Sequence, residues 1–122
     1  MSFVRPASLK FPQIYGTFKA NDKAGTSQVE YVIQDLPEAN FEEALTLLTE
    51  VYLPDETLYR SRGLVGNVDA TNEARECWRR KLGMKTSLGC FQSGSTELAG
   101  LYVLGVVSKG DVSYVVSVLI CL

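Results

Sequence analysis

The residues best suited to chemistry lie between Tyr52 and Tyr59, where two adjacent carboxylates, Asp55 and Glu56, directly follow Pro54. The sequence before them predicts an amphipathic helix, and proline is expected to end it because proline lacks an N–H and clashes with the preceding turn. A glutamate on irregular backbone just after a helix can point into a cleft and accept a proton. The alternative is a solvated acidic turn, with the two tyrosines capping the core instead of lining a pocket.

The chain contains no histidine, which narrows the chemistry that it can perform. Catalysis by Ser-His-Asp or Cys-His groups is excluded, and no metal site is expected. Proton transfer must then depend on Asp, Glu, Lys, Tyr or Cys. The cysteines are spaced too irregularly for a disulfide framework or a CxxC metal site: Cys77, Cys90 and Cys121. Reduced thiols are expected, which indicates a reducing compartment and a cytoplasmic location.

The composition predicts one compact domain, since 46% of the 122 residues are hydrophobic and 10% are aromatic. A net charge of -2 leaves no basic excess to neutralise a phosphate backbone, so nucleic acid is not an expected partner. No uncharged apolar run is long enough to predict a transmembrane helix, and no membrane association is expected. Residues 1–28 carry four basic residues and one acidic residue, with no continuous apolar core. They are predicted to be a flexible leader before a domain of residues 29–122.

Hydrophobic spacing predicts a strand and then helices in the first two-thirds of the chain. Alternation predicts a strand over residues 29–34, and Pro37 stands near the start of a helix. The apolar residues of that helix recur at helical spacing and form one buried stripe: Phe41, Ala44, Leu45, Leu48 and Tyr52. A short helical turn is expected over residues 57–60. A third helix is predicted from Asp69, its expected N-cap, to Gly83.

From Thr86 the periodicity becomes that of extended chain, which predicts strands over residues 88–91, 97–107 and 112–122. The expected fold class is α+β: an antiparallel sheet of about four strands with two or three helices packed on it. The last eleven residues carry no charge. A strand that is apolar on both faces is normally covered by other parts of a protein on both faces. The domain is therefore expected to be incomplete at its C-terminus and to associate through this strand.

Several short segments resemble one enzyme family in their order and spacing. They are Val32–Glu38, Phe41–Leu45, Leu53–Glu56, Arg75–Trp78 and Glu97–Leu104, within a similarity that spans about two-thirds of the chain. The chain is similar to the insect arylalkylamine N-acetyltransferase-like proteins of the GCN5-related N-acetyltransferase (GNAT) superfamily, a group that includes dopamine- and agmatine-acetylating enzymes. The resemblance implies the N-terminal half of a GNAT fold. It also implies an enzyme that uses acetyl-CoA to acetylate arylalkylamines or related small amines.

The resemblance also implies roles for single residues. In that family the glutamate of the Pro-Asp-Glu segment is the general base, which assigns the role to Glu56. This carboxylate would take the proton that an ammonium substrate must lose before the amine attacks the acetyl thioester. The residues around it are implied to bind the substrate: Tyr52, Asp55 and Tyr59. The chain departs from the family at Thr57, where members often carry proline.

The family's coenzyme A loop, Arg/Gln-x-x-Gly-x-Gly/Ala, does not occur in the sequence. Such a loop binds the pyrophosphate through backbone N–H groups at a helix N-terminus. The nearest lookalike, residues 60–66, has the wrong glycine spacing and does not follow a predicted strand. No cofactor-binding residue is therefore assigned, and this chain alone is not expected to bind acetyl-CoA.

Three interpretations remain open. The first is a truncated amine N-acetyltransferase with little or no activity alone. The second is a non-catalytic product that binds amines or pairs with a full-length relative through its C-terminal strand. The third is an unrelated small α+β domain whose acidic turn is solvated. Coenzyme A binding would favour the first interpretation, and association without cofactor binding would favour the second.

Overall fold

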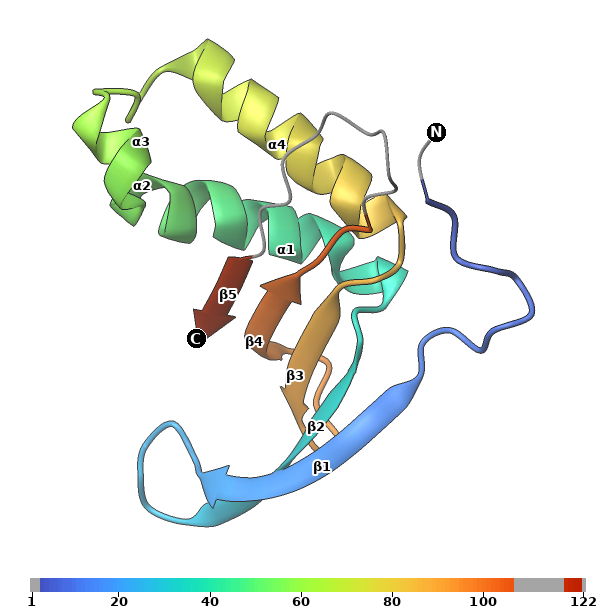
Figure 1. The fold of residues 1–122 in the computed structure, drawn as a ribbon. Helices are drawn as coiled ribbons and strands as arrows, with labels where there is room; N and C mark the ends of the chain where they lie inside the picture. Colours follow the sequence, from blue (N-terminus) through green and yellow to red (C-terminus); the bar gives the residue numbers. More distant parts are fainter. Residues whose placement is uncertain (1–2, 107–117, 122) are drawn as a thin grey trace.

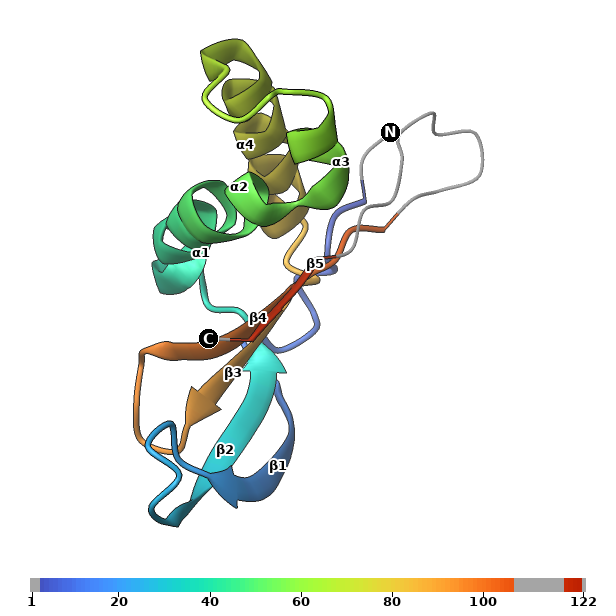
Figure 2. The same cartoon turned by 90° about the vertical axis from the view of Figure 1, so that its left-hand side faces the viewer.

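A computed structural model of the chain describes residues 3–106 and 118–121. They form a five-stranded antiparallel sheet in the order β1-β2-β3-β4-β5. The strands are β1 Ile14–Asn21, β2 Gln28–Asp35, β3 Leu88–Gln92, β4 Leu98–Val103 and β5 Val118–Cys121. The helices gather near the upper ends of β3 and β4, and the β1–β2 hairpin projects away from them (Figure 1, Figure 2). The predicted α+β class, an antiparallel sheet with packed helices, is confirmed.

The predicted strands are confirmed as β2, β3 and β4, the last of them shorter than expected. The strand predicted over residues 112–122 lies largely outside the described residues, and its described part contains β5. The sheet has one more strand than the approximately four predicted, because β1 was not foreseen.

Strand β1 lies within residues 1–28, where the sequence analysis predicted a flexible leader. The prediction of irregular chain is wrong for Ile14–Asn21, which pair along β2 from Gln34 to Gln28. None of the eight residues of β1 is buried. A strand without a buried face has no need of the apolar alternation by which strands are recognised. The pairing of β1 therefore comes from its backbone and from contacts distant in sequence.

The helical region starts with the 3-10 turn η1 Glu38–Asn40 and continues with α1 Phe41–Leu47, the π-helical turn η2 Leu48–Tyr52, α2 Leu53–Asp55, α3 Thr57–Ser61 and α4 Val68–Gly83. The short helical turn predicted over residues 57–60 is confirmed as α3, and the third predicted helix as α4. The N-cap of α4 is Asn67, whose Oδ1 accepts the Ala70 N–H at 2.9 Å, and not Asp69 as predicted. Both residue types suit this position, so local pattern could not distinguish them.

The helix that was predicted to end at Pro54 continues to Asp55. Directly before the proline the backbone widens into the π-helical turn, and the Leu53 N–H donates to the Leu48 carbonyl. Proline has no N–H to donate, and in a regular helix its ring clashes with the carbonyl four residues earlier. A wider turn at this point reduces that conflict. The chain leaves the helix at Glu56, whose backbone is extended.

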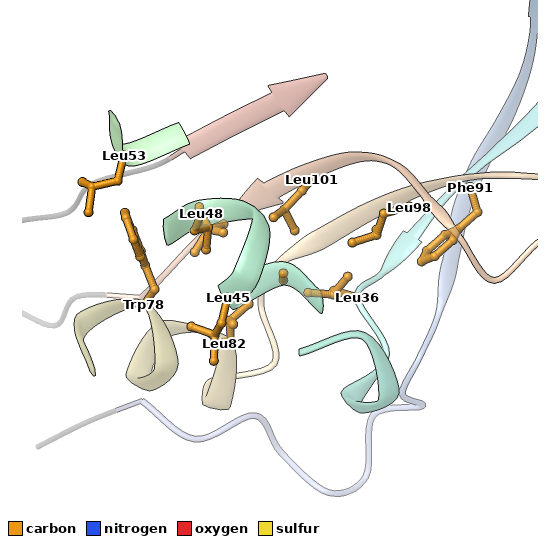
Figure 3. Packing of buried hydrophobic residues seen from close by; sticks show 11 residues of the cluster. Leu36, Leu45, Leu48, Leu53, Trp78, Leu82, Phe91, Leu98 and Leu101 are labelled. Carbon is orange, nitrogen blue, oxygen red and sulfur yellow. The ribbon is translucent and has the colours of Figure 1, made fainter. Parts of the chain in front are cut away.

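One hydrophobic core joins the helices to the sheet. Its buried members are Leu36, Ala44, Leu45, Leu48, Leu53, Trp78, Leu82, Phe91, Leu98, Leu101 and Val103. Figure 3 shows the leucines of the first helix between the α4 residues and the sheet. The predicted apolar stripe is confirmed, with Phe41 and Tyr52 packed against its edge. Trp78 is 5% exposed and belongs to this core, as its position on the apolar face of α4 predicted.

Candidate functional site

Glu56 links α2 to α3 and acts as the N-cap of α3. Its Oε2 accepts the Tyr59 N–H at 2.7 Å, and its Oε1 accepts the Leu58 N–H at 3.2 Å. Both carboxylate oxygens are therefore held by backbone donors at the start of a helix, where negative charge is favoured. The sequence analysis did not foresee this capping role, because glutamate is not among the usual N-cap residues.

Tyr52 lies beside Glu56 at the end of the π-helical turn. Partial burial raises the pKa of the Tyr52 phenol, and the negative charge of Glu56 raises it further. The phenol therefore stays protonated at neutral pH and can donate a hydrogen bond. Its ring meets Trp78 edge to face, with centroids 6.2 Å apart and planes at 72°. This geometry is favourable for two aromatic rings and anchors the tyrosine against α4.

Tyr59 connects α3 to α4 through its hydroxyl. The Tyr59 hydroxyl lies 2.9 Å from Oγ1 of Thr71, and that threonine donates its own proton to the Asn67 carbonyl at 2.9 Å. A hydroxyl carries one proton, so Tyr59 is the donor to Thr71. The hydrogen bond joins residues twelve apart, and no sequence signal marks it. It ties the helix that Glu56 caps to the longest helix of the fold.

We expect Tyr59→Phe to lower the free energy of unfolding by about 1 kcal/mol, because the partly buried Thr71 hydroxyl then loses a partner. Urea unfolding followed by circular dichroism measures the change. The matched control is Tyr31→Phe, whose hydroxyl donates to the Asn21 carbonyl at 3.3 Å on the exposed surface. Equal effects of the two substitutions would contradict a specific role for the Tyr59–Thr71 contact.

Asp55 does not join this group. Its side chain is 83% exposed, and it forms a loose ion pair with Arg60, whose Nη1 lies 3.9 Å from Oδ1 of Asp55. Ion pairs this exposed contribute little. Glu56, Tyr52 and the backbone of Tyr59 thus lie close together, whereas the Asp55 side chain points into solvent. The substrate-binding role predicted for Asp55 stays a prediction.

A groove of about 600 Å³ lies on the sheet, and none of the four predicted site residues lines it. Its lining includes Phe18, Tyr31, Ile33, Cys90 and Tyr102, together with the core residues Leu98 and Leu101. Sequence analysis missed this groove, since Phe18, Ala20 and Asn21 in its lining belong to the unforeseen strand β1.

The lookalike of a coenzyme A loop, residues 60–66, does not fit a pyrophosphate. It begins within the last two residues of helix α3 and does not follow a strand. At the start of α4 the Ala70 N–H is already engaged by the Asn67 side chain. An anion site at a helix N-terminus needs several free backbone donors that converge on it. Coenzyme A binding is therefore not assigned to residues 60–66.

Within residues 3–106 and 118–121, no three His, Cys, Asp or Glu side chains gather as a metal site would require. No helix in the same described ranges has both the length and the apolar composition needed to cross a membrane. Cys77 and Cys90 are half-buried and form no disulfide.

Comparison with known proteins relates the fold to one enzyme. Neither a protein-family model nor a curated protein sequence matches the chain. Among solved structures, the chain is similar to a protein named arylalkylamine N-acetyltransferase 7 from the yellow fever mosquito, with a TM-score of 0.82 and 31% identity. The match covers 92% of this chain and 47% of the mosquito chain. The chain therefore has a GNAT-like acetyltransferase fold and spans about half the length of the mosquito protein, and the resemblance to insect arylalkylamine N-acetyltransferases is confirmed.

Proposed function

We propose that this chain supplies the amine side of an acetyl-CoA-dependent N-acetyltransferase, with Glu56 as the general base. The observation that supports this most is the match in fold to an arylalkylamine N-acetyltransferase, over nearly the whole chain. The substrate class is arylalkylamines or related small amines. A cytoplasmic location forms part of the proposal and is consistent with Cys77 and Cys90, which form no disulfide.

The capping of α3 leaves Glu56 able to do this chemistry. An ionised carboxylate has about four lone-pair positions, and the two backbone N–H groups occupy one on each oxygen. One position on each oxygen stays available for an ammonium group or an ordered water. Because the backbone donors hold both oxygens, the base needs little reorganisation before it accepts a proton.

The proton balance of the reaction then follows. The substrate arrives as an ammonium ion, Glu56 takes one proton directly or through a water, and the neutral nitrogen can attack the acetyl carbonyl. Acetyl-CoA supplies the acetyl group: the C–N bond forms, the C–S bond breaks, and the departing thiolate takes the second proton that the nitrogen loses, which gives the amide and free coenzyme A. Tyr52 and Tyr59 are proposed to line the amine pocket. Asp55, exposed to solvent, can add only long-range attraction for a cation.

The chain alone is expected to give no measurable acetyl-CoA binding in calorimetry. Tight binding of this ligand needs a preformed set of backbone donors for its phosphates, and the sequence contains no Arg/Gln-x-x-Gly-x-Gly/Ala loop. A micromolar dissociation constant for the purified monomer would contradict this expectation and indicate a cofactor site outside the family pattern.

The function itself is tested in a fusion. The chain is joined to the part of the mosquito protein that it does not match, and acetylation of arylalkylamines is measured. We expect turnover by the fusion and none by either part. A folded fusion that binds acetyl-CoA but acetylates no amine would refute the proposed function.

A second candidate is a non-catalytic product that pairs with a full-length relative through β5. Among the described strands, β5 ends the sheet order, with β4 as its neighbour there. Backbone groups at a sheet edge can recruit another strand. Sedimentation analysis of the chain mixed with the intact mosquito protein would support this function if a mixed complex forms without acetyl-CoA.

A further inference from the structure

Strand β1 is held on the sheet with little burial. Seven of its eight residues are exposed and one is half-buried. Its large apolar side chains remain in solvent, with exposed fractions of 64% for Ile14, 55% for Tyr15 and 42% for Phe18. An edge strand that buries so little apolar surface gains little free energy from the hydrophobic effect. The hydrophobic effect therefore does not explain why β1 stays paired, and other contacts must contribute.

Those contacts meet at Asp35, the last residue of β2, which is 1% exposed. Its Oδ2 accepts the Gln13 N–H at 2.9 Å, and its Oδ1 accepts the Tyr15 hydroxyl at 3.0 Å. The Arg5 guanidinium lies 3.1 Å from Oδ2 and donates to Oδ1 at 3.3 Å. The oxygens of this buried carboxylate thus accept hydrogen bonds from Arg5 and Gln13, which precede β1, and from Tyr15 within β1.

Arg5 extends the same network. Its side chain is 10% exposed, and it also donates to the carbonyls of Lys85 at 3.0 Å and Lys10 at 2.9 Å. Two cations lie over the Phe11 ring, Arg5 at 5.3 Å and Lys85 at 5.2 Å from the ring centroid. One guanidinium therefore joins the N-terminal segment to the end of β2 and to the turn after α4.

The rest of the fold does not depend on this segment for its core. Every buried member of the hydrophobic core lies at Leu36 or later in the chain. The segment does build part of the groove on the sheet. Phe18, Ala20, Asn21 and Lys23 line it, and Phe18 stacks on Tyr31 with ring centroids 5.4 Å apart.

We propose that residues 3–21 form a releasable strap, and that the Arg5–Asp35 contact is its latch. While the Arg5–Asp35 contact is present, β1 stays paired with β2 and its side chains line one part of the groove. Without Arg5, Asp35 is a buried carboxylate that has lost its positive partner, a state that costs far more than an exposed charge. The carboxylate then gains free energy from hydration when the strap detaches from β2. Detachment removes the β1 side chains from the groove and leaves the hydrophobic core folded. This inference is independent of the proposed acetyltransferase function.

Hydrogen exchange of the full chain, read by mass spectrometry, tests the strap. In Arg5→Met, we expect amides of β1 to exchange at least about tenfold faster, while amides of β3 and β4 change by less than about twofold. Asp35→Asn should shift exchange in the same direction. The matched control is Arg60→Met, which removes a guanidinium that is 63% exposed, and should leave β1 unchanged.

Each other outcome overturns the proposal. Unchanged exchange in β1 would mean that Arg5 and Asp35 do not hold the strand. An equal increase in β1, β3 and β4 would mean that the contact stabilises the whole domain. An Arg5→Met chain that fails to fold would lead to the same conclusion, since a strap can be released without loss of the core. Tyr15→Phe, which removes one hydrogen bond of Asp35, provides a milder variant in which local and global effects can still be separated.

Discussion

Glu56→Gln should lower the turnover of an active fusion by about 10²-fold or more, because glutamine cannot accept the proton of the substrate ammonium. The substitution keeps the size of the side chain and one oxygen that can still cap α3. Steady-state acetylation of an arylalkylamine measures the effect, with kcat and KM determined separately across pH. The loss should appear mainly in kcat, since the missing group acts in the chemical step.

Two controls separate catalysis from structure. Asp55→Asn changes the neighbouring carboxylate, which is 83% exposed, and should leave turnover within about twofold. Urea unfolding of Glu56→Gln shows how much of the change comes from the weakened cap, which is worth about 0.5–2 kcal/mol. Turnover that is unchanged across the pH range would assign the general base to another residue.

Leu48→Ala should lower the free energy of unfolding by about 2–5 kcal/mol, the largest stability effect that we expect from a single substitution. Leu48 is 0% exposed and lies at the centre of the helical part of the core (Figure 3). Truncation loses the transfer free energy of the side chain and leaves a cavity that a close-packed core closes only partly. Leu48 also begins the π-helical turn, so the cavity adjoins the irregular backbone before Pro54.

Urea unfolding followed by the fluorescence of Trp78, the single tryptophan, measures this loss. Leu58→Ala is the matched control, because the same atoms are removed from a side chain that is 70% exposed, and its effect should stay within about 0.5 kcal/mol. A change below about 1 kcal/mol for Leu48→Ala would mean that the core relaxes around the deletion.

Sequence alone determined the elements that bury one apolar face. The stripe from Phe41 to Tyr52 predicted the first helix, and the apolar face around Trp78 predicted α4. Alternation predicted β2, β3 and β4. In each case the pattern lies within the element itself, because its period follows from the backbone geometry of a helix or a strand. The order of segments around Glu56 likewise carried the resemblance that the fold confirms.

Tertiary structure decided the features whose partners are distant in sequence. Strand β1 has no buried face, and its place depends on Arg5, Tyr15 and Asp35, which meet only in the folded chain. The hydrogen bond between the hydroxyls of Tyr59 and Thr71 joins α3 to α4. In each case the free energy comes from contacts between separate segments, so no pattern within one segment can predict it.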